Sequence, residues 1–397
     1  MTRRLLVIIS DRLSTLVHKG EVTQRYYNPG NVFEEVHILE INDDRPEAAA
    51  VQPMVGDATL VIHNLPAGLR TLVRSLGWRP RLLRRWAEGA VQLARSVRPS
   101  LVRCYGAHLN AYAAYRIRRV LGTPYVVSLH INPDEDVRGR ARGLKELILT
   151  RAIESVERIA LRSADLVLPV YEPIVPYLQK VGVSRFEVVH NALNPMCLGR
   201  KASYRLHDPV RMVSVGRQFA AKNATNLIRA LAALPGVQLT LIGDGPYHTR
   251  LVREAEVAGV SDRVEFRRAV ANDELCRRLP EFDLFAVHSE YWEISKAVLE
   301  ALLTGLPVVL NRRKGEPVPE LRNDLVLLVD DTPAAYAAAV RRLIQDHPYR
   351  ENLGRRAFEY ARAHWAPEHM EARVAKLYRG LLDTADRLRS EDVREDS

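Results

Sequence analysis

The chain has 397 residues, of which 47% are hydrophobic and 27% charged, and its formal net charge is +10. These proportions are typical of a globular protein and exclude a mostly disordered, collagen-like or coiled-coil chain. The three cysteines are far apart and show neither CxxC nor zinc-site spacing. We therefore expect no disulfide framework, no metal and a reducing, cytoplasmic setting.

The first half of the chain alternates between strand-like and helix-like patterns. Strands are expected at RRLLVIIS, TLVIHNL, SLVRCYG, TPYVVSLH, ADLVLPV and FEVVHNAL, and helices at NAYAAYRIRRVLG and KELILTRAIESVERIALRS. The opening MTRRLLVIIS has only five consecutive apolar residues, too few for a secretory leader, and predicts a first buried strand. Apolar strands alternating with amphipathic helices indicate a parallel sheet covered on both faces.

The second half restarts the same alternation. Strands are expected at RMVSVG, VQLTLIGDG, VEFRR, LFAVHS, PVVLNR and LVLLVD, with helices such as YHTRLVREAEVAGV, SKAVLEALLTG and PAAYAAAVRRLIQD between them. The α/β pattern predicts two doubly wound, Rossmann-like domains facing a cleft, since such sheets bind ligands at the carboxyl ends of their strands. The expected divisions are a first domain over 1–195, a linker over 196–209, a second domain over 210–365, a C-terminal helix over 366–386 that packs back on the first domain, and a frayed tail over 387–397.

Positive charge is concentrated between Arg70 and Arg103, where nine arginines stand against one acid, Glu88. Leucines, valines and two tryptophans are interleaved with them. Such a segment is either a solvated basic helix or an amphipathic surface that meets an anionic substrate or the anionic lipid on the inner face of a membrane. No nucleic-acid partner is expected, because no recognition motif accompanies the charge.

The segment VSVGRQFAAKNATNLIRAL is the first with the pattern of an anion site. A strand ends at Gly216, Arg217 follows at once, and Lys222 stands just before a helix. A helix N-terminus and two cations at the same edge of a sheet would hold a diphosphate, and glycine would let the backbone approach it closely. The alternative is a glycine turn beside two solvated cations.

Two further segments end strands of the second half. LTLIGDGP places Gly243 at a strand end, where it serves a ligand or only a tight turn. In HSEYWEISKAVLEALLTGLPVV a helix is expected from Ser295, so that Ser295, Lys296 and Ala297 would face phosphate or sugar. Glu300, on the second turn of that helix, would accept hydrogen bonds from ribose hydroxyls or merely complement the helix dipole.

Taken in order, G-R-x4-K, L-x-G-x-G-P and S-K-A-V-L-E-A-L-L-T-G-L-P-V-V resemble the retaining GT-B glycosyltransferases of family 4. The resemblance is strongest over 210–325, and Gly315-Glu-Pro-x-Pro-Glu320 resembles the family's glycine-rich turn. In the first half, YGAHLNAYAAYRIRRVLGTPYVVSLH resembles the family segment that ends in a histidine, and His190-Asn191-Ala192 stands where the family has Pro-Asn-Gly.

The resemblance implies a hexosyl- or N-acetylhexosaminyl-type transferase of carbohydrate biosynthesis. The second domain would bind a nucleotide-diphosphate-sugar, with UDP slightly favoured over GDP, and the first domain a glycan, lipid-linked or small-molecule acceptor. No cofactor would be needed, because the nucleotide-sugar is a substrate. The implied residues fall into three groups: catalytic His130, Arg217 and Lys222; donor-binding Gly216, Arg217, Lys222, Gly243, Glu293, Ser295, Lys296, Ala297 and Glu300; and acceptor-binding Lys19, Gly20, His108 and His130.

The chain departs from the family pattern at two places. The first Glu of the family's E-x7-E motif is Trp292 here, with Glu293 next to it, and Gly20 is followed by Glu21 instead of a second glycine. Glu293 therefore takes the place of the missing Glu through a shifted loop, or recognition of the sugar differs. The alternatives are a non-catalytic nucleotide-sugar-binding scaffold and a GT-B sugar-nucleotide epimerase.

Overall fold

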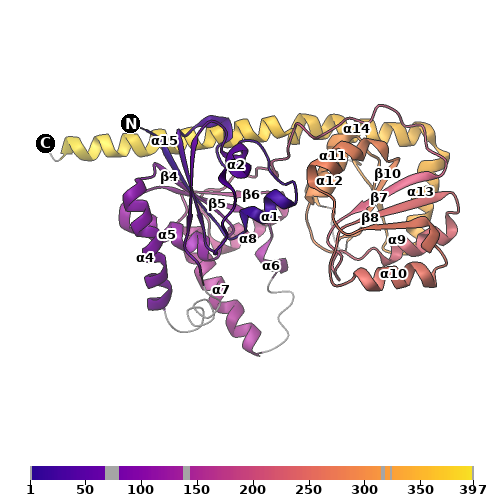
Figure 1. Ribbon diagram of the computed structural model, residues 1–397, viewed down its shortest axis with the longest axis horizontal. Helices are drawn as coiled ribbons and strands as arrows, with labels where there is room; N and C mark the ends of the chain where they lie inside the picture. Colours follow the sequence, from indigo (N-terminus) through magenta and orange to yellow (C-terminus); the bar gives the residue numbers. More distant parts are fainter. Residues whose placement is uncertain (1, 68–79, 137–143, 314–317, 322–323, 396–397) are drawn as a thin grey trace. The chain divides into compact units, whose positions relative to one another are not determined.

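The computed structural model of the protein describes residues 2–67, 80–136, 144–313, 318–321 and 324–395. The chain forms two compact α/β units, and Figure 1 shows the elements of each. Unit 1 contains Met1–His18, Val22–Ala192 and Glu368–Ser397, and unit 2 contains Lys19–Glu21 and Leu193–Pro367. Among the described residues, no helix combines the length and the apolar character needed to span a bilayer.

Unit 1 is built on a six-stranded parallel sheet with the order β3-β2-β1-β4-β5-β6. Its strands are β1 Arg4–Ile9, β2 Glu35–Glu40, β3 Thr59–Asn64, β4 Leu101–Tyr105, β5 Tyr125–Leu129 and β6 Leu166–Pro169. Its helices are α1 Leu13–His18, α2 Ala48–Val51, α4 Pro80–Val97, α5 Leu109–Leu121, α6 Pro133–Asp136, α7 Leu144–Arg162, α8 Val175–Val181 and, from its second residue on, α15 Pro367–Glu395. β2 and β3 extend the sheet on one side of β1, and β4, β5 and β6 extend it on the other side.

Unit 2 repeats this arrangement with the order β12-β11-β10-β7-β8-β9. Its strands are β7 Val210–Val215, β8 Val237–Ile242, β9 Val264–Arg267, β10 Leu284–Val287, β11 Val308–Asn311 and β12 Leu327–Val329. Its helices are α9 Thr225–Ala230, α10 His248–Val257, α11 Asn272–Arg278, α12 Lys296–Thr304, α13 Pro333–Gln345 and α14 His347–Trp365. The sheet changes direction between β7 and β10, just as that of unit 1 does between β1 and β4.

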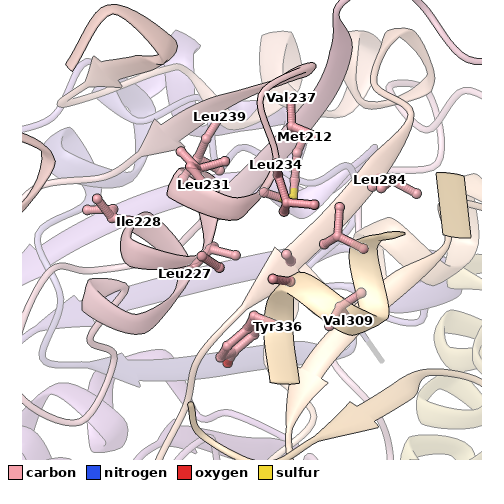
Figure 2. Close-up of a cluster of buried hydrophobic side chains, with 14 of the residues drawn as sticks. Met212, Leu227, Ile228, Leu231, Leu234, Val237, Leu239, Leu284, Val309 and Tyr336 are labelled. Atoms are coloured by element: carbon pink, nitrogen blue, oxygen red, sulfur yellow. The ribbon is translucent and has the colours of Figure 1, made fainter. Parts of the chain in front are cut away.

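Each unit has its own apolar core. In unit 2, Figure 2 shows side chains of the central strands, such as Met212 and Leu239, gathered with those of the flanking segments, such as Leu231 and Tyr336. In unit 1 the corresponding core includes residues of α15, among them Tyr378 and Leu382. The two parallel sheets flanked by helices confirm the predicted α/β class.

The structure differs from the sequence-based expectations at two strands. FEVVHNAL forms no named strand, since only Phe186 makes an isolated bridge, to Val167 of β6. The helix α15 continues to Glu395 through RLRSEDVRE, which contains no Gly or Pro to end it, and the expected fraying over 387–397 stays a prediction. β2 was not predicted, although its run EVHILE follows the two-residue period of a strand in its first half.

The basic segment over Arg70–Arg103 is not one continuous surface. Arg70, Arg74 and Arg79 lie outside the described residues. On α4, Arg81, Arg84 and Arg85 are exposed, whereas Leu83 and Ala87 pack against α5 in the protein interior. Arg103 is buried on β4, where it donates to Tyr378 Oη and, at 2.6 Å, to Ser128 Oγ. Counting Arg103 with the surface cations was therefore wrong, because its strand lies in the core.

Candidate functional site

A cavity lies at the point where the sheet of unit 2 changes direction. Gly216 and Ser214 line it from the end of β7, Val287 and His288 from the end of β10, and Lys222 from the loop before α9. Parallel α/β sheets open a crevice at such a switch point, because the loops of the two neighbouring strands diverge there. The predicted diphosphate residues Gly216 and Lys222 therefore lie where this fold class binds ligands.

His288 holds the loop that carries Lys222. Its Nδ1 accepts a hydrogen bond from the backbone N–H of Asn223 at 3.1 Å, and its Nε2 lies 3.2 Å from Asp331 Oδ2. Burial lowers the pKa of His288 despite the carboxylate beside it. A neutral ring with its proton on Nε2 satisfies both contacts. His288 was not predicted from the sequence, although a histidine at the end of a strand pattern was a usable signal.

Lys222 is paired with Glu293. Lys222 Nζ lies 2.7 Å from Glu293 Oε1, and only 21% and 14% of the two side chains are exposed. Arg217 is exposed, and its guanidinium lies 5.5 Å from the centre of the Phe219 ring. Of the two predicted cations, Arg217 is therefore open to solvent, whereas the charge of Lys222 is partly neutralised by a carboxylate.

A second cavity, lined by Glu293 and Ser295, extends along the end of β11. Asn311, the last residue of β11, also lines it and holds Ser289 in place, since its side chain accepts from the Ser289 N–H at 2.8 Å and donates to the Ser289 carbonyl at 3.0 Å. The Arg313 guanidinium donates to the same carbonyl at 3.2 Å. Asn311 and Arg313 were also missed, although polar residues that directly follow a buried strand are the usual signal for a binding edge.

The helix expected from Ser295 begins there. Ser295 is the N-cap of α12, and its Oγ accepts from the Val298 N–H at 3.3 Å. Lys296 and Ala297 form the first turn and are half-buried. Lys296 Nζ lies 3.5 Å from Glu21 Oε1, which belongs to the short segment of unit 2 around Gly20. The N-terminus of α12 thus places positive charge at the same edge of the sheet as Lys222.

Glu300 is enclosed in this structure. Only 2% of it is exposed, and its Oε1 accepts from Asn272 Nδ2 at 2.9 Å. Burial raises the pKa of Glu300, while Lys296 and a hydrogen bond from the Cys276 thiol act in the opposite direction. A ribose that uses this carboxylate has to displace Asn272, a contact that the sequence could not reveal.

Gly243 has a packing reason to be glycine. Its φ is +134°, and a Cβ there would collide with the Gly216 carbonyl. Gly243 therefore lets the turn after β8 pack directly against the turn after β7, where it contacts the backbone of Gly216.

In the segment Lys19–Glu21, the Lys19 carbonyl accepts from the Asn272 N–H at 2.8 Å, and Gly20 has a φ of +64°. These two predicted acceptor residues belong to unit 2.

The other predicted residues lie in unit 1. His130 Nδ1 is 3.1 Å from Asn191 Oδ1, and its ring stacks on Tyr105 at a centroid distance of 5.7 Å. His108 Nε2 is 2.8 Å from Glu157 Oε1; more than half of the histidine is exposed, whereas the carboxylate is buried. Both histidines follow ends of strands of the unit 1 sheet and are oriented by a polar partner, which is the arrangement expected of residues that contact a substrate.

Two family models match the chain in succession. The model described as Glycosyltransferase Family 4 matches residues 34–196, and the model described as Glycosyl transferases group 1 matches residues 200–360. Together they cover most of both units. The chain belongs to the GT-B glycosyltransferases of family 4.

Among the curated relatives of this chain is the lipopolysaccharide core biosynthesis glycosyltransferase LpsE of Rhizobium meliloti. It is 33% identical over 154 residues, which are 38% of this chain and 44% of the relative. A GDP-mannose-dependent phosphatidylinositol monomannoside mannosyltransferase of Mycobacterium tuberculosis is 29% identical over 45% of this chain and 49% of its own length. The chain thus spans about half the length of the first curated relatives it matches.

Solved structures share the fold. HepE of Anabaena, crystallised with UDP, superposes with a TM-score of 0.72 over 95% of this chain and all of that one, at 15% identity.

Within the family 4 pattern, Trp292 occupies the position of the first motif Glu and is 37% exposed, while the neighbouring Glu293 lines the cavity beside Ser295. The displaced carboxylate therefore reaches the edge at which the motif Glu was expected.

Proposed function

We propose that this protein is a retaining glycosyltransferase that moves a sugar from a nucleotide-diphosphate-sugar to an acceptor. The observation that carries the proposal is the cavity at the β7/β10 switch point, lined by Gly216 and Lys222. The N-cap of α12, Ser295, lines a second cavity at the carboxyl edge of the same sheet. Positive charge in a crevice of this kind suits a diphosphate. It would also stabilise that diphosphate as it leaves with the electrons of the glycosidic bond.

The proposed roles follow the positions of the residues. Arg217 and Lys222 neutralise the leaving diphosphate, and Ser295, Lys296 and Ala297 bind phosphate or sugar at the start of α12. Glu300 holds the ribose hydroxyls after Asn272 moves aside. Glu293, beside Lys222, takes over contacts with the sugar hydroxyls that the missing motif Glu would make. His130 faces the transferred sugar, and His108 contacts the acceptor.

For the donor we propose a UDP-hexose or a UDP-N-acetylhexosamine. A related structure is described in complex with UDP-glucose, which supports UDP, whereas the mycobacterial relative is named for GDP-mannose. Base preference is therefore tested with both nucleotides. The acceptor is a glycan, a lipid-linked sugar or a small molecule.

We also propose that α4 brings the protein to an anionic membrane surface. Arg81, Arg84 and Arg85 are exposed on one stretch of this helix, and each cation near a charged bilayer contributes about 1 kcal/mol. Co-sedimentation with vesicles containing 30% phosphatidylglycerol tests this. Changing the three arginines to Gln should release the protein, whereas unchanged sedimentation would contradict the proposal.

The experiment for the main proposal is a transfer assay with UDP- and GDP-sugars and a panel of sugar and lipid-linked acceptors. Release of the nucleotide diphosphate that depends on the acceptor, together with an α-linked product from an α-linked donor, supports a retaining transferase. Binding of nucleotide-sugar without any turnover favours the scaffold alternative. Conversion of the donor sugar without an acceptor favours the epimerase.

A further inference from the structure

The sheet of unit 1 has its own switch point, between β1 and β4, and a cavity of about 210 Å³ lies there. Ser10 follows the end of β1 and Gly106 the end of β4, and both line the cavity. Open α/β sheets bind ligands at such switch points, so this cavity is a candidate ligand site, like the cavity at the β7/β10 switch point of unit 2. None of the donor residues named above belongs to it.

The wall of this cavity is largely hydrocarbon. Ile41, Leu109, Ile153 and Val156 contribute aliphatic side chains from the segment after β2, from α5 and from α7. Among the described lining residues, His108 is the one that can carry a charge. A dry apolar cavity of about 150 Å³ is enough to bind benzene. The cavity of unit 1 thus has room for a ring or a short alkyl chain.

Ser10, His108 and Asn110 add polar side chains to the lining of this cavity. His108, more than half exposed, is held by the buried Glu157, which also accepts from Tyr177 Oη at 3.2 Å. The hydrophobic cluster that includes Val156 and Leu109 continues into α4 through Leu83, beneath the exposed arginines of that helix. An amphipathic molecule with a hydrocarbon part and a hydroxyl-bearing part matches this arrangement.

We propose that the cavity binds a hydrocarbon group of the acceptor, with His108 contacting the polar part next to it. The inference rests on the proposed glycosyl transfer and narrows its acceptor to glycosides or alcohols that carry an alkyl, isoprenoid or aryl group. Each methylene that enters the cavity should tighten binding about three- to fourfold, because each leaves water for an apolar wall.

The first test detects the hydrocarbon directly. In protein with 13C-labelled Ile, Leu and Val methyl groups, 1-hexanol and benzene should shift the methyl resonances of Ile41, Ile153 and Val156 with saturation. Val156→Phe, which fills the cavity, should abolish the shifts, and Ile153→Phe is a second variant at a less buried position. Ile159→Phe is the matched control, because Ile159 is on the same helix but 45% exposed and outside the lining.

The second test separates this inference from the proposed function. Methyl, hexyl and phenyl glycosides of one acceptor sugar are compared in the transfer assay, and UDP and GDP binding is measured in parallel. The proposal is supported if the KM of the hexyl or phenyl glycoside is at least tenfold lower than that of the methyl glycoside. In Val156→Phe this difference in KM should disappear while nucleotide binding persists. The glycoside with the lower KM shows whether the acceptor carries an alkyl or an aryl group. Saturable methyl shifts without transfer of any sugar would refute the transferase function, and with it the acceptor part of the inference. Transfer with equal KM values, or an absence of saturable methyl shifts, would overturn the cavity inference alone.

Discussion

Lys222 Nζ and Glu293 Oε1 form an ion pair of 2.7 Å at the edge of the unit 2 sheet where a diphosphate is proposed to bind. The Glu293 carboxylate therefore contacts a cation of the switch-point cavity and also lines the second cavity, beside Ser295. A diphosphate bound as proposed would compete with Glu293 for Lys222, and the released carboxylate would then be available for sugar hydroxyls. We propose this exchange as the role of Glu293, which stands one residue after the family position.

The first prediction concerns this pair. Lys222→Gln should weaken UDP or GDP binding at least tenfold, because a hydrogen bond to a charged group contributes about 1.5–3 kcal/mol. Glu293→Gln should tighten binding of the bare diphosphate severalfold, because it removes a competing negative charge, yet lower kcat with the full donor. Isothermal titration calorimetry measures nucleotide binding to the two variants, and the transfer assay measures kcat. Glu254→Gln, which breaks the Arg229–Glu254 pair elsewhere in unit 2, is the control and should change neither.

The second prediction concerns Glu300 and Asn272. If Glu300 holds the ribose, wild type should prefer UDP over 2′,3′-dideoxy-UDP at least tenfold, and Glu300→Ala should bind the two alike. Asn272→Ala should bind UDP at least as tightly as wild type, because Asn272 competes with ribose for the carboxylate. If Glu300→Ala lost the same factor of affinity for UDP and for 2′,3′-dideoxy-UDP, Glu300 would have a structural role only.

Much of this site follows from the sequence alone. Gly216, Lys222 and Ser295 were predicted because each ends a β-strand pattern or begins a helix pattern, and the structure brings them to one edge of one sheet. The fold class followed from the same alternation. These features are local, so hydrophobic periodicity and capping residues are sufficient to reveal them.

The features that were missed depend on contacts between distant parts of the chain. Asn272 reaches Glu300 over 28 residues, and Arg103 reaches Tyr378 over 275. Arg103 was counted with the surface arginines because the sequence of β4 does not show that Tyr378, on the helix near the C-terminus, accepts its hydrogen bond. Burial of a charged side chain is decided by tertiary packing, which neither spacing nor composition contains.

The third prediction concerns that buried guanidinium. Tyr378→Phe should lower the free energy of unfolding by about 1–3 kcal/mol, because Arg103 then keeps its charge in the core with one acceptor fewer. Tyr204→Phe, which removes a neutral hydrogen bond to the Gly305 carbonyl in unit 2, is the comparison and should cost about 1 kcal/mol. Urea denaturation measures both, and a smaller loss in Tyr378→Phe than in Tyr204→Phe would argue against a charged bond.

The fourth prediction concerns pH. Glu40 is fully buried at the end of β2, and burial raises its pKa from 4.5 to about 7, although its Oε1 accepts from the Leu13 N–H at 3.0 Å. Between these values the unfolded chain releases the proton while the folded protein keeps it. Stability should therefore fall as pH rises from 4.5 to 7, by at most about 3 kcal/mol.

Glu40→Gln should remove this dependence and stabilise the protein at pH 8. Glu35→Gln, on the same strand, is the control of opposite sign, because hydrogen bonding to Arg4 lowers the pKa of Glu35. That variant should be destabilising at pH 7 and neutral in acid. Urea midpoints at pH 3, 4.5, 7 and 8 report both effects, and a wild-type slope between pH 4.5 and 7 that persists in Glu40→Gln would assign the pH dependence to other groups.

The central claim is that unit 2 binds a nucleotide diphosphate at the β7/β10 switch point. Its most direct test is thermal unfolding of the wild type and of the double variant Arg217→Gln/Lys222→Gln with UDP, GDP and ADP. A ligand at about 100 times its Kd adds about 2.7 kcal/mol, which corresponds to a rise of about 5–10 °C for a domain of this size. We expect one base, UDP by preference, to produce that rise in the wild type and little in the double variant. No rise with any of the three nucleotides, or an equal rise in both proteins, would contradict the assignment.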